Sequence, residues 1–401
     1  MTAAPAPASA GLTLLLGLVI GLAALGMDLF LPAVPAIARA FDASPGAAQF
    51  CVTTYLLGLA GGQLLWGPVS DRYGRKPALL AGLALFLAAS LAAATAQSLA
   101  AVAALRCAQG IAMSSGSVIA RSVVRDLYAR EHAAQLLGRM TVVFGLVPIF
   151  APLAGAQALA WGWQAVFWLY AAIAAALLAA VALALSETAP PERAPIAPGR
   201  VAASFARLLG DRRFVAPLAT LLCALVGIVA FVSNSSLVMV QALGLSPAGF
   251  SFAFAAIMVG HLAGGFACSR LVHRLGMAGL LRAGAALALA AGGTLAALAF
   301  AGVTHWSAIV APMLAYVIAL AFIVPNATAA ALTPFPAMAG AASSLLGVLP
   351  FALGALASAA LGAAFDGSAR PMAAAVALAG AGAFAAERLL YARLPRGAVH
   401  G

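Results

Sequence analysis

The chain has 401 residues, of which 65% are hydrophobic and only 8% are charged, and its mean hydropathy is +1.07. This composition excludes a soluble globular protein and indicates that lipid surrounds most of the chain. The net charge of +11 would suggest nucleic-acid binding in a soluble protein. Here the basic residues are scattered over short segments between apolar stretches, so we expect no nucleic-acid partner.

Apolar stretches of about 20 residues recur roughly twelve times, and each is long enough to cross a bilayer as a helix. In the first half of the chain, spans are predicted at Leu12–Ile37, Ala47–Trp66, Ala78–Gln97, Leu99–Val123, Gln135–Leu159 and Trp163–Leu185. In the second half, they are predicted at Phe214–Ser236, Phe250–Leu271, Met277–Ala301, Trp306–Ala331, Ala339–Phe365 and Met372–Tyr391. We therefore expect an all-α integral membrane protein with twelve transmembrane helices.

One long polar stretch, from Ser186 to Arg213, lies near the middle of the chain and contains four prolines. Such a composition is typical of a linker. The predicted domains are a six-helix half at residues 1–185, a cytoplasmic linker at 186–212 and a second six-helix half at 213–401. A basic segment follows the second span of each half, at Arg72–Lys76 and at Arg270–Arg274. A duplicated six-helix unit explains this recurrence.

The basic residues fall on alternate connections between the predicted spans. If the segment around Arg72 faces the cytoplasm, then 18 of the 21 Lys and Arg residues lie on that side, whereas Arg39 and Arg370 face outward and Arg106 lies inside a span. Besides Arg72, Arg75 and Lys76, the cytoplasmic set comprises Arg121, Arg125, Arg130, Arg139, Arg193, Arg200, Arg207, Arg212, Arg213, Arg270, Arg274, Arg282, Arg388, Arg393 and Arg396. This asymmetry follows the positive-inside rule and predicts that both termini are cytoplasmic.

Several enzyme and pump classes find no support in the sequence. The chain has four cysteines with no C-x-x-C spacing and no accompanying histidine cluster, so neither a metal nor a cofactor is expected. An ATP-driven pump would need a phosphate-binding loop, but Lys76 is the only lysine and a proline follows it. The Ser114–Gly116 segment has no histidine at a matching depth, which argues against an intramembrane hydrolase.

The most informative segment is Gly67–Lys76, GPVSDRYGRK, which interrupts two apolar stretches with four charges. It resembles the signature loop of the major facilitator superfamily, with Val69 where Leu is commoner. That resemblance implies two six-helix halves with a substrate site between them near the membrane midplane. Gly265–Gly276 resembles a degenerate second copy, with Ser269 in the position of the aspartate.

In such transporters the signature loop acts as a conformational latch and does no chemistry. We expect Gly67 to permit close helix approach, Gly74 to permit a tight turn and Asp71 to pair with arginines at a neighbouring helix end. The predicted latch residues are Gly67, Asp71, Arg72, Gly74, Arg75, Arg121, Arg125 and Asp126. The alternative is an ordinary charged turn.

Two further segments are similar to motifs of proton-coupled exporters. Arg106–Gly110, RCAQG, resembles the motif around their membrane-embedded arginine, and Gly145–Gly155 resembles their Gly- and Pro-rich antiporter motif, with Ala151 where Gly is usual. Proline removes a helix hydrogen bond and glycine removes side-chain bulk, so this run predicts a bend. The predicted helix-bend residues are Gly145, Pro148, Pro152 and Gly155. Ordinary helix packing is the alternative.

Other segments narrow the resemblance to the bicyclomycin- and chloramphenicol-resistance (Bcr/CflA) type of exporter. These segments are Asp28–Ile37, Ala120–Tyr128, Leu243–Pro247, Pro325–Thr328 and Pro334–Pro336. Gln164 departs from the pattern, because that type usually has Arg there. The resemblance implies proton-driven efflux of amphipathic drugs across a bacterial inner membrane, and we expect a monomer. A facilitator or importer of a small metabolite would share the fold and is the alternative.

Asp28 is the one acid predicted to lie within a hydrocarbon span, where it costs about +2.5 to +3.5 kcal/mol to insert. Such residues are functional by default, and an apolar surrounding favours the neutral carboxyl, so Asp28 can bind a proton on one side and release it on the other. Arg106 lies at a similar depth, about 10 to 14 Å from the outer end, and would favour proton release. A polar anchor at Asp28 and a structural Arg106 are the alternatives.

Polar and aromatic residues within the spans are candidates for a substrate pocket. Aromatic rings suit flat apolar drugs, whereas a single polar residue in a span more often bonds a neighbouring helix. The predicted pocket residues are Phe30, Tyr55, Gln109, Phe231, Asn234, Phe254, His261 and Asn326.

Overall fold

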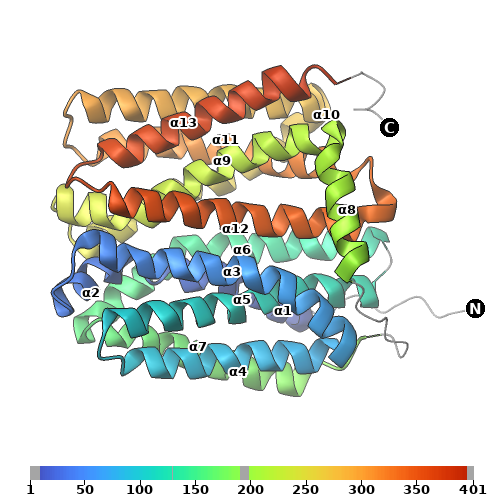
Figure 1. The fold of residues 1–401 in the computed structure, drawn as a ribbon, viewed down its shortest axis with the longest axis horizontal. Coiled ribbons are helices and arrows are strands. Elements are labelled where there is room, and N and C mark those ends of the chain that lie inside the picture. Colours follow the sequence, from blue (N-terminus) through green and yellow to red (C-terminus); the bar gives the residue numbers. More distant parts are fainter. Residues whose placement is uncertain (1–9, 129, 190–197, 395–401) are drawn as a thin grey trace, which may run out of the picture. The chain divides into compact units, whose positions relative to one another are not determined.

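A computed structural model describes residues 10–128, 130–189 and 198–394, and every secondary-structure element within these ranges is helical (Figure 1). Arg193 and Arg396 of the predicted cytoplasmic set lie outside the described residues, as does part of the predicted linker. Contacts between residues divide the chain into two compact units. The first comprises Met1–Ala43 and Phe50–Ile196, and the second comprises Ser44–Gln49 and Ala197–Gly401.

The helices of the first part of the chain are α1 (Ala10–Asp28), α2 (Val34–Ala40), α3 (Pro45–Tyr73), α4 (Arg75–Ala94), α5 (Leu99–Leu127), α6 (Arg130–Ala158) and α7 (Gln164–Ala184). Those of the second part are α8 (Pro198–Gly210), α9 (Arg212–Ser236), α10 (Pro247–Phe300), α11 (Ser307–Leu332), α12 (Ala339–Ala363) and α13 (Arg370–Ala386). Short 3₁₀ turns are η1 (Leu31–Ala33), η2 (Leu159–Trp161) and η4 (Pro336–Met338), and π-helical turns are η3 (Leu237–Ala242) and η5 (Glu387–Tyr391).

Ten helices among the described residues are long and apolar enough to cross a membrane. One of them, α10, has 54 residues and contains two of the predicted spans, because Gly276 leaves the helical conformation with φ of 67°. The antiporter-like helix α6 adds a shorter apolar segment, Gly145–Trp161. With α10 counted as two spans and α6 included, the helices match the twelve predicted spans in number and order.

The structure corrects one predicted boundary and adds detail to two other predicted segments. Helix α3 continues to Tyr73 and α4 begins at Arg75, so Gly74 alone separates them where a longer loop was predicted. The charged residues that ended the apolar stretch lie in helical turns, because leaving the apolar pattern does not end a helix. The predicted linker contains α8, and the first predicted span is broken after Asp28.

Helix α8 is amphipathic and packs on the second unit. Leu208 is fully buried in a cluster with Phe214 and Phe335, whose rings meet edge to face with centroids 5.9 Å apart, whereas Arg207 is exposed. Burial of an apolar stripe against a neighbouring helix explains why a polar stretch of sequence forms a helix here. Figure 1 shows α8 running across the ends of neighbouring helices of its unit.

The glycine between α3 and α4 adopts φ of 105° and ψ of 158°, a conformation that residues with a Cβ rarely adopt. Gly276 in α10 adopts φ of 67° and ψ of 170°. The two basic segments therefore turn in the same way at matching places in the two parts of the chain, which favours the duplication predicted from the sequence.

Candidate functional site

The first membrane span is interrupted in its interior. Pro32 cannot donate a backbone hydrogen bond, and the chain passes from α1 through the tighter turn η1 into α2. At the break, the Phe30 N–H donates to the Met27 carbonyl at 3.1 Å, as in a 3₁₀ turn. The carbonyl of Gly26, which would accept that bond in a continuous α-helix, is thereby left for other donors.

Two side chains donate to this carbonyl. Arg106 of α5 donates from Nη2 to the Gly26 oxygen at 2.7 Å, and Tyr170 of α7 donates its hydroxyl to the same oxygen at 2.8 Å. Tyr55 of α3 donates to the Ala23 carbonyl one turn earlier, at 2.7 Å. Helices α3, α5 and α7 are thus bound to the broken end of α1.

Arg106 is fully buried, and its charge is balanced without a carboxylate in direct contact. Its guanidinium lies 4.3 Å from the Phe30 ring centroid and 4.1 Å from that of Tyr55. Nη1 donates to Gln109 Oε1 at 2.8 Å, and Gln109 in turn donates to Ser90 Oγ at 2.8 Å. Aromatic faces and the negative end of the α1 dipole both stabilise a cation here. Within the described residues, Arg106 Nε is buried and has no hydrogen-bond partner.

Asp28 is 5% exposed and lies inside the span Gly11–Ala40, away from both ends. The structure brings Arg106 to Gly26, two residues before Asp28, but none of the ion pairs formed by described residues includes Asp28. Acidic residues inside membrane spans are functional by default.

The Gly- and Pro-rich run of α6 packs against the same break. Pro148 and Pro152 lie inside α6, and Gly145 lies between them and the start of the helix. A Cβ added at Gly155 would overlap the carbonyl oxygen of Leu29, the residue after Asp28. Close contact between α6 and the end of α1 therefore requires glycine at this position.

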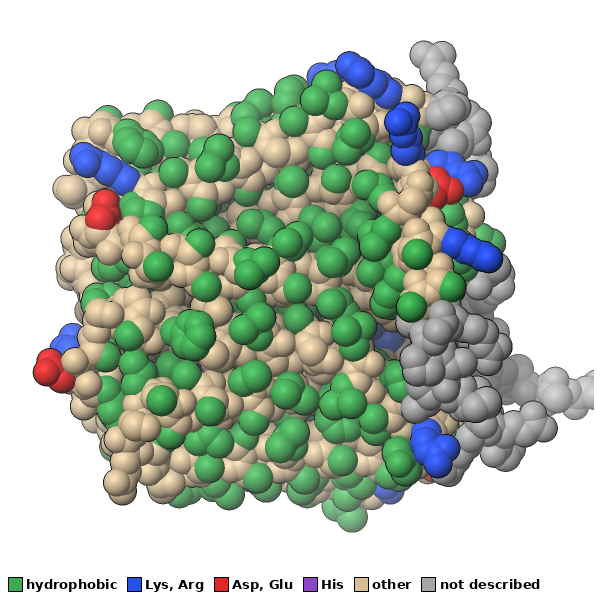
Figure 2. Space-filling model, viewed as in Figure 1, with side chains coloured by type: hydrophobic (Ala, Val, Ile, Leu, Met, Phe, Trp, Pro, Cys, Tyr) green, Lys and Arg blue, Asp and Glu red, His purple; other side chains and the backbone are tan. Residues whose placement is uncertain are grey.

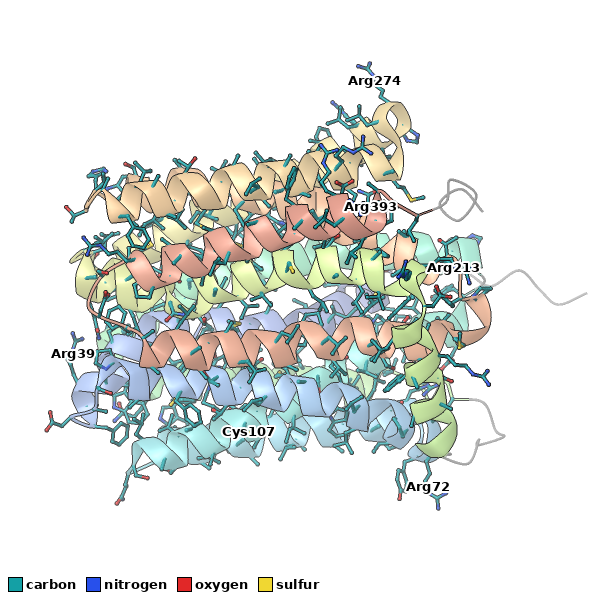
Figure 3. All side chains as sticks on the ribbon, turned by 45° about the horizontal axis from the view of Figure 1, so that its top comes forward. Arg39, Arg72, Cys107, Arg213, Arg274 and Arg393 are labelled. Carbon is teal, nitrogen blue, oxygen red and sulfur yellow. The ribbon has the colours of Figure 1, made fainter. Side chains whose placement is uncertain are left out.

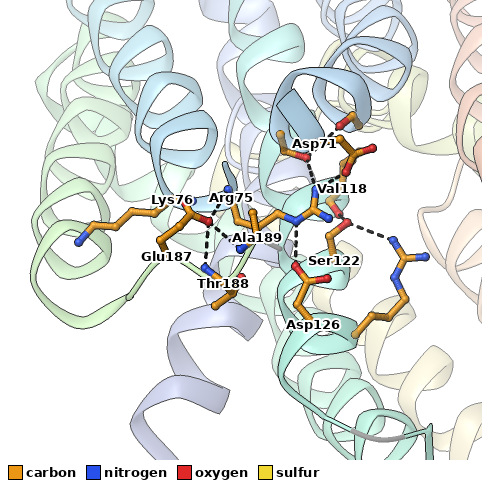
Figure 4. A network of polar contacts seen from close by, with 12 residues as sticks. Asp71, Arg75, Lys76, Val118, Ser122, Asp126, Glu187, Thr188 and Ala189 are labelled. Atoms are coloured by element: carbon orange, nitrogen blue, oxygen red, sulfur yellow. Dashed lines mark hydrogen bonds and ion pairs between the residues drawn. The ribbon is translucent and has the colours of Figure 1, made fainter. Parts of the chain in front are cut away.

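Arg75 is the centre of the predicted latch (Figure 4). Its Nε donates to Asp126 Oδ2 of α5 at 2.9 Å, its Nη1 donates to Ser70 Oγ at 2.9 Å, and it forms an ion pair with Asp71 of α3. Asp71 thus pairs with Arg75. Arg121 instead donates to the Ser117 carbonyl at 2.7 Å.

Three other latch candidates are Arg72, Arg125 and Gly67. Arg125 donates to Ser122 Oγ at 3.1 Å, and the guanidinium of Arg72 lies 5.7 Å from the Tyr73 ring centroid. A Cβ added at Gly67 would meet no described atom within 4 Å, so the predicted close helix approach is absent at this glycine.

Sequence reasoning missed Glu187, which completes this network. Its Oε1 accepts from the Arg75 N–H at 2.8 Å and from the Thr188 and Ala189 N–H groups at 2.9 Å each, and its Oε2 accepts from the Lys76 N–H at 3.3 Å. Burial raises the pKa of Glu187, but the four backbone donors outweigh it and lower the pKa below its ordinary value. A residue from the end of α7 therefore caps the start of α4, for which Gly74 has no side chain.

The pocket candidates of the second unit lie in packed surroundings. The Phe231 and Phe254 rings stack with centroids 6.0 Å apart and an interplanar angle of 10°. Asn234 donates to the Ala230 carbonyl of its own helix, and His261 contacts the Val317 carbonyl of α11 at 3.1 Å. Asn326 donates to the Phe322 carbonyl at 2.7 Å. His261 thus contacts a neighbouring helix, whereas these bonds of Asn234 and Asn326 lie within their own helices. Phe30, Tyr55 and Gln109 surround Arg106 in the first unit.

Comparison with known proteins identifies the family. The signature of the Major Facilitator Superfamily matches residues 16–359. The chain belongs to the major facilitator superfamily. It is therefore a multi-pass membrane transporter and not an enzyme.

Two relatives have names associated with drug resistance. The bicyclomycin resistance protein homolog of Haemophilus influenzae is 30% identical over 352 residues, which cover 86% of each chain. Multidrug resistance protein D of Escherichia coli K12 is 32% identical over 342 residues, covering 84% of this chain and 85% of the relative. These relatives confirm the resemblance to bicyclomycin-resistance transporters that the motifs indicated.

A solved structure confirms the fold. The xylose transporter XylE from E. coli, in a partially occluded inward-open conformation, superposes with a TM-score of 0.74 at 14% identity. The match covers 96% of this chain and 97% of XylE. The chain thus has the helical major facilitator fold, as predicted from the sequence.

In this major facilitator protein, Tyr170, Ser90 and Glu187 join the predicted residues through hydrogen bonds. A weak sequence signal for Tyr170 exists, because a lone tyrosine in an apolar span has a hydroxyl that needs a hydrogen-bond partner when buried. Glu187 gave no such signal, because it lies in the polar segment predicted as a linker, more than a hundred residues after Arg75, from which it accepts a hydrogen bond.

Proposed function

We propose that the protein exports small amphipathic, drug-like molecules across the bacterial inner membrane in exchange for protons. The observation that carries the proposal is Asp28, a buried acid inside a span, at a helix break to which Arg106 is bound. Acids in this position serve as proton relays in transporters. The names of the two relatives support drugs as the substrate class.

The break in α1 supplies a means of coupling. When Asp28 is neutral, Arg106 keeps its hydrogen bond to the Gly26 carbonyl, which is the bond seen in the structure. An ionised Asp28 would attract the guanidinium, whose Nε is still without a partner, and so weaken its bond to the helix end. The proton state of Asp28 would then decide how firmly α1 is held to α5 and α7, and alternating access would follow that change.

The contacts of Arg75 support a latch made in one conformation and broken in another. Arg75 of α4 donates a charge-assisted hydrogen bond to Asp126 of α5, and Glu187, which follows α7, accepts from the Arg75 N–H. A contact present in one state shifts the balance between states by its own free energy. We propose that this latch stabilises one conformation and does not itself bind the substrate.

We propose substrate-contacting residues in each unit, namely Phe30, Tyr55 and Gln109 in the first and Phe231, Asn234, Phe254, His261 and Asn326 in the second. A neutral or zwitterionic drug fits best, because Asp28 and Arg106 offer one charge of each sign, and a strongly charged drug would leave an unpaired charge in a low dielectric. We further propose a monomer with a six-helix half at each end of a cytoplasmic linker and with both termini in the cytoplasm, as the distribution of basic residues indicates.

Efflux from everted membrane vesicles tests the proposal. We expect a panel of phenicol-like and bicyclomycin-like drugs to include at least one that accumulates in the vesicles, and accumulation to cease when the pH gradient is collapsed. Drug-independent equilibration of a sugar or organic acid, unaffected by the pH gradient, would instead establish the facilitator alternative.

A further inference from the structure

A cluster of arginines lies at one end of the second unit, where α10 turns at Gly276 and where α13 ends. Its members are Arg270, Arg274, Arg282, Arg388 and Arg393, and all five are exposed. We call this cluster the basic end. Figure 3 shows Arg274 and Arg393 at the same end of the unit, and Figure 2 shows Lys and Arg side chains gathered there.

The charge of the basic end is largely uncompensated. Glu387 lies between two of its arginines, with Oε1 3.5 Å from Arg282 Nε and Oε2 3.6 Å from Arg388 Nε, and its side chain is only 1% exposed. Residues 197–401 hold only two other acids, Asp211 and Asp366. Asp211 pairs with Arg213, and Asp366 precedes α13, at the opposite end of that helix. Within the described part of the second unit, Glu387 is therefore the carboxylate that pairs with members of the basic end, namely Arg282 and Arg388.

Exposed apolar side chains lie close in sequence to these arginines. Phe266 is 60% exposed and lies under the Arg270 guanidinium, which is 4.1 Å from its ring centroid. Leu275 and Met277 flank Gly276, and Leu389 follows Arg388 with 54% exposure. A surface facing water alone rarely exposes such apolar groups together, whereas the boundary between lipid tails and headgroups accommodates both kinds of side chain.

We propose that the basic end binds the headgroup of an anionic phospholipid, with the acyl chains against the exposed apolar side chains beside the arginines. Guanidinium groups bind phosphate oxygens in pairs, and their fork geometry suits a phosphodiester. Basic clusters next to the ends of membrane helices recognise anionic lipids in this way. Glu387 of η5 pairs with Arg282 of α10, so a lipid bound at the basic end would contact both α10 and η5. The inference does not depend on the transported substrate.

Native mass spectrometry of the purified full chain in detergent tests this site. Titration with phosphatidylglycerol should give tighter binding of the first lipid than titration with phosphatidylcholine. Replacing two arginines, Arg270→Gln with Arg274→Gln, should weaken phosphatidylglycerol binding by about five-fold for each arginine and leave phosphatidylcholine binding unchanged. Raising the ionic strength should weaken the same binding.

The matched control is Arg370→Gln, an exposed arginine at the other end of α13. It should retain the preference of the wild-type protein. Equal affinity of the wild-type protein for the two lipids, or an equal loss in the control, would overturn the proposal. If the double variant unfolds, as judged by its thermal midpoint, the single variant Arg393→Gln should still weaken phosphatidylglycerol binding several-fold, and an unchanged affinity would contradict the site.

Discussion

Glu187 should stabilise the first unit by capping α4, and this stabilisation should be lost in acid. Four backbone N–H groups donate to its carboxylate, including those of Arg75 and Lys76 in the first turn of α4. Loss of a capping side chain costs about 0.5 to 2 kcal/mol. Glu187→Gln keeps one acceptor oxygen, and the site is exposed to water, so we expect about 1 kcal/mol, or about 1 to 2 °C in the thermal midpoint.

The pH dependence has a definite sign. The pKa of Glu187 is lower in the folded protein than in the unfolded chain, so the ionised carboxylate stabilises the fold at pH values above about 4.3. That stabilisation is lost as the pH falls through the folded-state pKa. The difference between wild type and Glu187→Gln should therefore be complete above about pH 5 and should shrink below about pH 4.

Thermal unfolding of the purified protein in detergent, followed between about pH 3.5 and 7, measures this difference. Asp42→Asn, an exposed carboxylate near Arg39, is the control and should leave the midpoint unchanged at every pH. A Glu187→Gln variant as stable as wild type at pH 7, or a difference that grows on acidification, would refute the reasoning.

Arg75→Ala should destabilise the fold by about 1 to 3 kcal/mol and lower the thermal midpoint more than Arg39→Ala, because it removes the arginine donor from the buried Ser70 hydroxyl and the part-buried Asp126 carboxylate; equal midpoints would argue against the network. Asp71→Asn removes an exposed partner, so stability should change by less than about 1 kcal/mol while the drug transport rate changes more than drug binding; normal turnover would remove the latch role. Gly58→Val should destabilise the fold, because its Cβ would overlap the Cys107 carbonyl, whereas Gly61→Val meets open space; a Gly58 variant as stable as the Gly61 variant would be inconsistent with this packing.

The sequence alone predicts the helix number, the order of the spans and the family, because long apolar stretches and a signature of ten residues are local patterns. It also identifies Asp28 and Arg106, since a charge inside an apolar span is conspicuous. What it does not predict is how Arg106 is held. The carbonyl of Gly26 becomes available only because Phe30 bonds Met27, a consequence of backbone geometry at the break.

Contacts distant in sequence account for the other differences. Glu187 caps α4 by accepting hydrogen bonds from backbone N–H groups, and because almost every residue has such a group, the amino-acid sequence does not reveal the contact. The helical start of the signature segment, up to Tyr73, has polar side chains that a hydropathy pattern assigns to a loop. Gly155 is readable as a bend or packing residue, but the carbonyl of Leu29 that it contacts is visible only in the fold.

Proton exchange through Asp28 is the central claim, and proton release on drug addition tests it most directly. Purified wild-type protein and Asp28→Asn would be reconstituted into vesicles with a pH-sensitive dye, and a transported drug would then be added. Wild-type protein should move protons against the drug, whereas the variant should insert normally but move none, because an amide cannot take up a proton. Asp28→Asn vesicles that still accumulate the drug against its gradient and release protons would contradict it.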